Sequence, residues 1–166
     1  MRKIILITTL FFISIISFAS EYIYYKGNST SVFDIVYILK DNKMFKGRST
    51  SFSDNIIFTI KDNSIYRGNS SSIFDIAYTI KDNKVFEGRS TSFSDNIIFT
   101  IKDNSIYRGN SSSIFDIVYT IKYNKVFEGR STSFSDNIIY TVNNSEDIYK
   151  VILPLLLMRK SPNISV

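Results

Sequence analysis

Three arginines stand at the same place in a recurring loop sequence and could form anion-binding sites. The eight residues GRSTSFSD occur at 47–54, 88–95 and 129–136, so each arginine is followed by a serine and then an aspartate at fixed spacing. The planar guanidinium group binds carboxylate, phosphate or sulfate through paired hydrogen bonds. Three weak sites acting together would bind a polymer such as an acidic glycan more tightly than one site alone. The candidate ligand-binding residues are therefore Arg48, Ser51, Asp54, Arg89, Ser92, Asp95, Arg130, Ser133 and Asp136.

The same loops also have a purely structural interpretation. A related sequence, GNSSSIFD, lies between them at 68–75 and 109–116, and GNSTSVFD at 27–34 opens the series, with asparagine in place of arginine. Serine and threonine hydroxyls satisfy backbone groups in turns, and an aspartate can accept N–H groups where a strand begins. In this interpretation each arginine pairs with a nearby aspartate and binds no ligand.

The composition argues against catalysis and against a resident metal. The chain has no histidine and no cysteine, so the common pairs of nucleophile and base are missing. The loop aspartates repeat six times in equivalent positions, whereas an active site usually needs one asymmetric set of groups. The Asp-Asn pairs do not form a calcium loop of the D-x-D-x-D-G type. We therefore predict a protein that is not an enzyme, with no catalytic residues, no metal site and no cofactor.

The loops belong to a double repeat that predicts an all-β fold. Glycines at 27, 47, 68, 88, 109 and 129 alternate in spacing between 20 and 21 residues, which makes a period of 41 residues. Residues 47–76 and 88–117 are identical. Within each half, a β-branched and aromatic run such as IIFTIK at 56–61 is followed by Asp62-Asn63 and a shorter run at 65–68. Asp and Asn tolerate the positive φ of a two-residue hairpin turn, so we predict six tandem hairpins preceded by one strand at 22–25.

The unequal halves predict a pseudo-threefold object. The extra residue of alternate halves lies just after the loop aspartate, at Asn55, Asn96 and Asn137, where it would form a β-bulge. Isolated hairpins are marginal in water and these have apolar residues on both faces, so they must shelter one another. A flower-like or propeller-like ring, a prism or a trefoil would fit, and an open two-sheet β-solenoid is the alternative. We favour a closed ring because the strand at 22–25 could pair with the final hairpin and leave no free edge.

The two ends of the chain differ from the repeat. Residues 1–19 have the pattern of a secretory signal peptide, with Arg2 and Lys3, an apolar stretch and small residues for cleavage after Ala19. An uncleaved membrane anchor is the alternative, but the apolar run is short for a membrane span. The repeat domain is predicted at 20–150, with Asp147–Lys150 as its last short strand. Residues 151–166 form an apolar tail with a polar end, in which Val151 to Met158 would pack on the sheet, plug the ring or make a weak contact with a membrane surface or partner.

The charge and the leader indicate an exported protein that does not bind nucleic acid. The net charge of +5 falls to about +3 without Arg2 and Lys3, and acidic and basic residues alternate along the chain. The predicted location is periplasmic, secreted or on the cell surface. No cysteine is available for a stabilising disulfide in that environment.

The repeated unit resembles a known architecture. The pattern I-Y-x-G-x-S … D-x-x-[YF]-T-I-K-D-N, from about residue 22 to 149, resembles the β-flower and propeller-like hairpin-repeat proteins of bacteria. DNIIFT at 54–59 is also similar to the threefold monocot-type mannose lectins. The sugar-binding motif Q-x-D-x-N-x-V-x-Y of those lectins is absent, and the chain contains no glutamine. The resemblance therefore implies an architecture and no functional residues.

These observations predict an exported, non-enzymatic repeat domain. Its first interpretation is a multivalent binding module for a glycan or a protein partner. The alternative is a structural or assembly protein with no small ligand.

Overall fold

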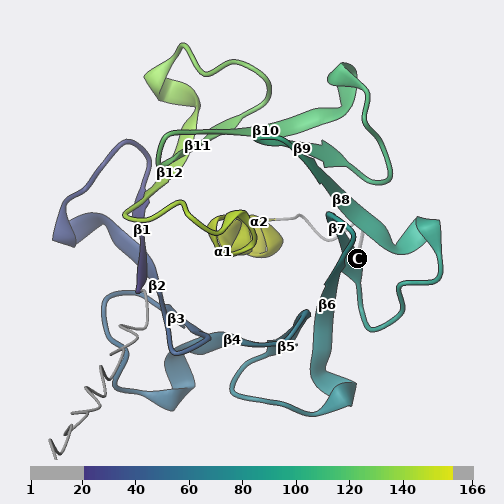
Figure 1. The fold of residues 1–166 in the computed structure, drawn as a ribbon. Helices are drawn as coiled ribbons and strands as arrows, with labels where there is room; N and C mark the ends of the chain where they lie inside the picture. Colours follow the sequence, from purple (N-terminus) through teal and green to yellow (C-terminus); the bar gives the residue numbers. More distant parts are fainter. Residues whose placement is uncertain (1–20, 159–166) are drawn as a thin grey trace, which may run out of the picture.

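The strands form a closed ring. The computed structural model describes residues 21–158, which form twelve β-strands followed by two short α-helices. Each strand pairs with two neighbours in a closed antiparallel barrel (Figure 1), so the predicted ring is confirmed and the open solenoid is excluded. The strands are β1 (Tyr22–Lys26), β2 (Ile35–Lys40), β3 (Lys43–Lys46), β4 (Ile56–Lys61), β5 (Ser64–Arg67), β6 (Ile76–Lys81), β7 (Lys84–Glu87), β8 (Ile97–Lys102), β9 (Ser105–Arg108), β10 (Ile117–Lys122), β11 (Lys125–Glu128) and β12 (Ile138–Val142). The helices are α1 (Ile148–Val151) and α2 (Leu153–Met158).

Two-residue turns join the long and short strands of five hairpins, as the Asp-Asn pairs predict. Asp41 and Asn42 have φ of 49° and 60°, and both flanking lysines pair across the hairpin. Tyr123 replaces the usual aspartate and still has φ of 53°, because the turn imposes this conformation on whatever residue occupies it. These turns lie at one end of the barrel, which we call the turn end. The glycine-led loops lie at the opposite end, which we call the petal end.

The sixth two-stranded unit is made from the two ends of the repeat region. β1 pairs with β12, in a register that places Tyr24 opposite Val142 and Lys26 opposite Tyr140. The Ile23 N–H donates to Asn143 Oδ1 at 2.8 Å, and Asn143 Nδ2 donates to the Glu21 carbonyl at 3.1 Å. The strand predicted at 22–25 therefore closes the ring and leaves no free edge.

Every long strand carries a bulge, and not alternate strands as predicted. Between β3 and β4, Met44 pairs with Phe58 and Phe45 with Ile56, so Ile57 is the extra residue. The same register shift occurs in all six pairs that join a short strand to the long strand that follows it. Asn55 instead ends a turn of 3-10 helix, so the additional residue of alternate halves lengthens the loop and leaves the strand unchanged. Asn96 and Asn137 hold the equivalent positions.

Apolar side chains are buried on both faces of the wall. One residue of each short strand is fully buried in the central core, and together these form a ring of Tyr24, Met44, Ile65, Val85, Ile106 and Val126. The next residue along β3, Phe45, points to the outer face because side chains alternate. Phe45 and its cross-strand partner Ile56 are nevertheless buried.

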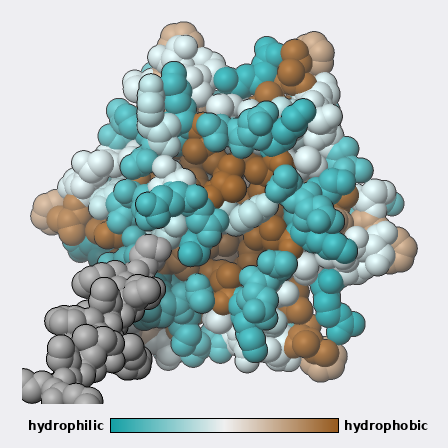
Figure 2. Space-filling model, in the orientation of Figure 1, coloured by the Kyte–Doolittle hydropathy of each residue, from teal (hydrophilic) through white to brown (hydrophobic). Residues whose placement is uncertain are grey.

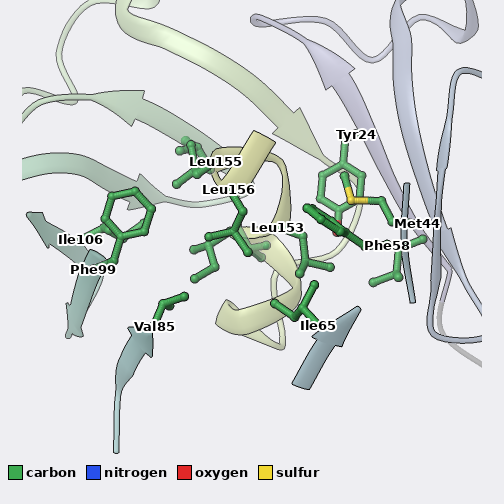
Figure 3. Close-up of a cluster of buried hydrophobic side chains, with 14 of the residues drawn as sticks. Tyr24, Met44, Phe58, Ile65, Val85, Phe99, Ile106, Leu153, Leu155 and Leu156 are labelled. Carbon is green, nitrogen blue, oxygen red and sulfur yellow. The ribbon is translucent and has the colours of Figure 1, made fainter. Parts of the chain in front are cut away.

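The apolar tail fills the barrel. Val151, Ile152, Leu153, Leu155 and Leu156 are buried against the wall (Figure 3), so this helical segment is a plug. The strand predicted at Asp147–Lys150 is wrong, because Asp147 caps α1 by accepting the N–H groups of Tyr149 and Lys150. The plug therefore begins before residue 151, the predicted domain boundary.

Two tyrosines of the wall, Tyr24 and Tyr140, donate to backbone carbonyls of the plug near Pro154. Pro154 has no N–H to donate to the Lys150 carbonyl, and the Leu155 N–H donates to Ile152 and not to Val151. Tyr24 Oη donates to the Lys150 carbonyl at 2.7 Å, and Tyr140 Oη donates to the Val151 carbonyl at 2.8 Å. Burial raises the pKa of both phenols well above the ordinary value. Neighbouring groups raise these pKa values further, Tyr22 and Asp147 in the case of Tyr24 and Tyr24 and Tyr119 in the case of Tyr140.

Burial of the plug removes most of the tail from the surface. A membrane or partner contact through Val151 to Met158 would have only the half-buried Leu157 and the exposed Met158 available. No helix within residues 21–158 is long and apolar enough to cross a membrane. The predicted leader at 1–19 and the polar end at 159–166 lie outside the described residues.

Candidate functional site

The loops at the petal end are anchored to the barrel by their glycines. We call residues 27–34, 68–75 and 109–116 the short petals and residues 47–55, 88–96 and 129–137 the long petals. Each glycine has positive φ, and its N–H donates to the carbonyl of the bulge residue, as Gly47 does to Val36 at 2.8 Å. In five of the six units a threonine hydroxyl also donates to the glycine carbonyl, as Thr59 does to Gly68 at 2.7 Å. The petals therefore start from fixed points on the wall.

The aspartates of the short petals hold their own loops. Ser29 Oγ donates to Asp34 Oδ2 at 2.6 Å, and Ser31 Oγ accepts the N–H of Phe33 at the start of the 3-10 turn. Both bonds recur in the other two short petals. The aspartates of these three loops therefore have a structural role, but they accept a serine hydroxyl and not the predicted N–H groups at the start of the strand.

The long petals use their polar groups differently. Asp54, Asp95 and Asp136 are exposed, and each is bonded only to the hydroxyl of the serine just before it, at 3.4–3.5 Å among the described contacts. The 3-10 turn begins after a phenylalanine and has no side-chain cap. Ser51, Ser92 and Ser133 are exposed, and their N–H groups donate to the serine two residues earlier. These aspartates and serines remain available to a ligand.

The arginines of the long petals lie beside the preceding short petals. The Arg48 guanidinium carbon lies 5.8 Å from the centre of the Phe33 ring, and that of Arg130 lies 5.9 Å from the Phe115 ring. Arg89 occupies the equivalent exposed position in the remaining long petal, at 88–96. Within residues 21–158 no ion pair joins any of these arginines to an aspartate. Their pairing with aspartate, the structural alternative, is therefore absent from the described part of the chain.

A shallow groove separates a short petal from the following long petal. Between the last two petals it is lined by Ile114 and Ile117 on one side and by Arg130, Ser131 and Asn137 on the other, with Glu128 below. Of the predicted residues of this petal, Arg130 lines the groove, whereas Ser133 and Asp136 do not. The petals radiate from the barrel (Figure 1) and do not converge on its axis, so the three sets of predicted residues lie apart around the ring. The lining combines one cationic group, the Ser131 hydroxyl, the Glu128 carboxylate and apolar side chains.

Sequence reasoning missed the exposed phenylalanines. Each petal carries one, with 65–85% of its side chain exposed, and a half-exposed valine or isoleucine precedes it in each short petal. The signal was present as one phenylalanine in each otherwise polar loop. These side chains are Phe33, Phe52, Phe74, Phe93, Phe115 and Phe134.

The arrangement offers binding chemistry without a metal centre. Among residues 21–158 no three acidic side chains lie close enough together to hold a metal ion. The groups that the petals present are guanidinium, hydroxyl, carboxylate and aromatic surface, each repeated around the ring.

Comparisons with known proteins agree with the architecture. The model of a family described as 6-fold beta flower protein matches residues 24–152. No curated protein matches the chain. An X-ray structure of a protein from Arabidopsis thaliana is similar, with 17% sequence identity, coverage of 82% of this chain and 89% of that chain, and a TM-score of 0.44.

Proposed function

The chain belongs to the six-fold β-flower family, and we propose that it is an exported, non-enzymatic repeat domain that binds an acidic glycan. The ligand lies in three equivalent grooves, each between a short petal and the next long petal. Each groove supplies one arginine, from Arg48, Arg89 or Arg130.

One observation carries this proposal. The short petals use Asp34 and its equivalents to lock their own loops, whereas Asp54 and its equivalents in the long petals are exposed and bonded only to an adjacent serine. Polar groups that are exposed and do not hold the loop are free to bind a ligand. The long petals alone carry the arginine. The guanidinium groups of Arg48 and Arg130 lie over an aromatic ring, and within residues 21–158 none of the three arginines has an aspartate partner.

The chemistry of the groove suits an acidic sugar. Arginine binds a carboxylate or sulfate through two donors in a fixed plane. The exposed face of a phenylalanine ring can stack on the apolar C–H face of a sugar ring. Serine hydroxyls can donate hydrogen bonds to sugar hydroxyls or accept them, and the carboxylate of Asp54 can accept them.

Affinity comes from three grooves acting on one polymer. A shallow groove binds a single sugar weakly, since little surface is buried. Three grooves held at fixed positions on one rigid barrel raise the effective concentration of the second and third contacts, and gains of about 100-fold or more are typical. The grooves therefore favour a long chain over its monomer.

Binding to polygalacturonate and dextran sulfate, with neutral dextran as the negative ligand, tests this proposal. Replacing Arg48, Arg89 and Arg130 by alanine together should weaken binding to the acidic polymer about 100-fold or more. The matched control replaces Lys26, Arg67 and Arg108 by alanine. These residues lie directly before the short petals at the same end of the barrel, so the control removes the same charge in the same threefold pattern.

The control variant distinguishes specific binding in the grooves from general electrostatic attraction to the protein surface. The proposal expects the control variant to keep most of its affinity. Equal losses in the two variants would show that only net charge matters, and binding of neutral dextran as tightly as of the acidic polymers would also contradict the proposal.

A structural or assembly protein remains the second candidate, and one observation favours it. Six exposed phenylalanines at the petal end give the surface an apolar character that could join copies of the chain. Sedimentation velocity would show concentration-dependent oligomers, and replacing Phe33, Phe74 and Phe115 by serine would abolish them. A monomer across the concentration range would exclude this candidate.

Export is part of the proposal. The residues before Ala19 have the pattern of a cleaved leader. N-terminal sequencing of the protein recovered from its native cell should begin at Ser20. A protein that retains Met1 would contradict export by this route.

A further inference from the structure

The plug covers the inner wall unevenly at the turn end. The fifth residue of each long strand points inward, and at four of the six places it is buried, at Leu39, Ile101, Ile121 and Val142. At the other two places, Ile60 of β4 and Ile80 of β6 remain half-exposed. The barrel interior is therefore open on one side of the plug.

The uneven cover of the inner wall results from the position of α1. Its backbone is held by Tyr24 of β1 and Tyr140 of β12. Toward the opposite wall, Tyr78 Oη of β6 donates to the Leu156 carbonyl of α2 at 3.2 Å, and Tyr149 Oη of α1 donates to Asn83 Oδ1 at 2.7 Å near the surface. The space left beneath this contact is a cavity of about 330 Å³.

The cavity has an apolar floor and a polar rim. Ile60, Ile65, Ile80 and Leu153 line its inner part, and Asn42 and Asn63 contribute amide groups at the edge. Figure 2 shows apolar surface at the centre of this face inside a ring of hydrophilic side chains. The volume lies at the lower end of the range for small-molecule sites, about 300–1,000 Å³.

The charges at the rim favour a cation. Lys150 also lines the cavity, but its ammonium lies 3.6 Å from Asp147 Oδ2 and 5.3 Å from the centre of the Tyr22 ring. Asp62 and Asp82 are exposed lining residues with no hydrogen bond or ion pair in the described part of the chain, and Lys81 is the second lysine of the lining. Lys61 and Lys84 flank the two turns but do not line the cavity. Among the lining residues, carboxylates without a partner therefore outnumber ammonium groups without one.

We propose that this cavity, which we call the mouth pocket, binds a small amphipathic organic cation. The apolar part of the ligand lies on the half-exposed Ile60 and Ile80, and its cationic group lies at the rim beside Asp62 and Asp82. The pocket is at the opposite end of the barrel from the petals, so the proposal is independent of glycan binding.

The duplicated sequence supplies an internal control. Residues 47–76 and 88–117 are identical, so Asp62 and Asp103 have the same neighbours in the sequence, as do Ile60 and Ile101. Ile60 and Asp62 line the mouth pocket, whereas Ile101 is buried. The same substitution made in either copy therefore tests the pocket and not the local sequence.

Titration of the full chain with hexylammonium chloride, followed by NMR, tests the proposal, with sodium hexyl sulfate as the anion of equal tail length. We expect saturable shifts of the amides of Ile60, Asn63 and Ile80 with hexylammonium, and at least tenfold weaker binding of hexyl sulfate. Asp62→Asn should weaken hexylammonium binding about threefold or more, while Asp103→Asn should leave it unchanged. Asparagine tolerates the positive φ that both turn positions have, so both variants should fold.

A space-filling variant provides a second readout. Ile60→Phe should fill the pocket and abolish hexylammonium binding with the melting temperature nearly unchanged. Equal effects of Asp62→Asn and Asp103→Asn, hexyl sulfate binding as tight as hexylammonium binding, or the absence of saturable binding would each overturn the proposal.

Discussion

At the scale of single residues, the departures from the repeat show where the plug is held. Tyr24 stands where the equivalent strands have Met44, Ile65 and Val85, and Tyr140 stands where β4 and β8 have Phe58 and Phe99. The two tyrosine rings meet edge to face with centroids 6.1 Å apart. Their hydroxyls donate to the Lys150 and Val151 carbonyls, next to the break in the helix before Pro154.

Replacing Tyr140 by phenylalanine tests this assignment. The change restores the residue found at the equivalent places in β4 and β8 and removes only the hydroxyl that donates to the Val151 carbonyl. A buried carbonyl without a partner costs about 1–3 kcal/mol, so the free energy of unfolding in urea should fall by that amount. Tyr37→Phe is the matched control, because Tyr37 holds the same place in β2 and makes no hydrogen bond to the plug within residues 21–158. Equal effects of the two changes would contradict the role of Tyr140.

The buried phenols also predict loss of stability at alkaline pH. Their folded-state pKa values lie above the ordinary value of about 10, so the folded protein binds more protons than the unfolded chain once the pH exceeds that value. Their contribution is complete below about pH 10 and is lost as the pH rises toward the folded-state pKa values. Circular dichroism and tyrosinate absorbance should show part of the phenols ionising only together with unfolding. Ionisation of every tyrosine near pH 10 with the fold intact would contradict this assignment.

At the scale of elements, the sequence predicts the wall well and the plug poorly. The limits of β4 and the pairing of Thr59 with Tyr66 follow from alternation and from the Asp62-Asn63 turn. The segment at 147–150 resembles a short strand by its residue types, but β1 already occupies the last free edge of the sheet. A segment inside an apolar barrel must satisfy its own backbone, which a helix does. Local propensity could not reveal this, since it depends on which strand closes the ring.

The petals, too, are predicted only in part from the sequence. The sequence identifies the repeated arginines, serines and aspartates, but it cannot show that Asp34 holds its loop while Asp54 does not. One inserted residue shifts the 3-10 turn from Val32–Asp34 in the first petal to Ser53–Asn55 in the second. That shift removes the side-chain cap and leaves the aspartate exposed. A count of residues alone assigns the insertion to the strand, where a bulge is already present in every unit.

Removing the plug should destroy the packed interior. Burying each of Val151, Ile152, Leu153, Leu155 and Leu156 contributes about 1.5–3 kcal/mol. Their sum is comparable to the whole net stability of a domain, about 5–15 kcal/mol. A chain that ends at residue 146 should therefore bind a hydrophobic dye and lose cooperative unfolding, measured by circular dichroism and dye fluorescence.

A shorter deletion controls for this experiment. A chain that ends at residue 158 keeps every described contact of the plug and should melt within a few degrees of the full chain. Equal melting temperatures for the full chain and the chain ending at 146 would show that the wall is stable without the plug.

At the scale of the whole molecule, a nearly symmetric wall encloses an asymmetric core. Repeated units fix the same register six times, and a single helical segment breaks the symmetry by leaning on β1 and β12. We therefore propose repeated sites for a repeating polymer at the petal end, and one pocket for one small molecule at the turn end. The repeated sites follow from the symmetric wall, and the single pocket follows from the asymmetric position of the plug.

Closure of the ring around its own C-terminal segment is the central claim, and one NMR measurement tests it directly. Tyr24 and Tyr140 lie outside the identical stretches, so their ring signals can be assigned separately. With ring centroids 6.1 Å apart, a NOESY spectrum should show cross-peaks between the two rings, and from both rings to protons of residues 150–152 in the plug. The absence of cross-peaks between these rings in the folded monomer, 116 residues apart in the chain, would contradict a closed and plugged barrel.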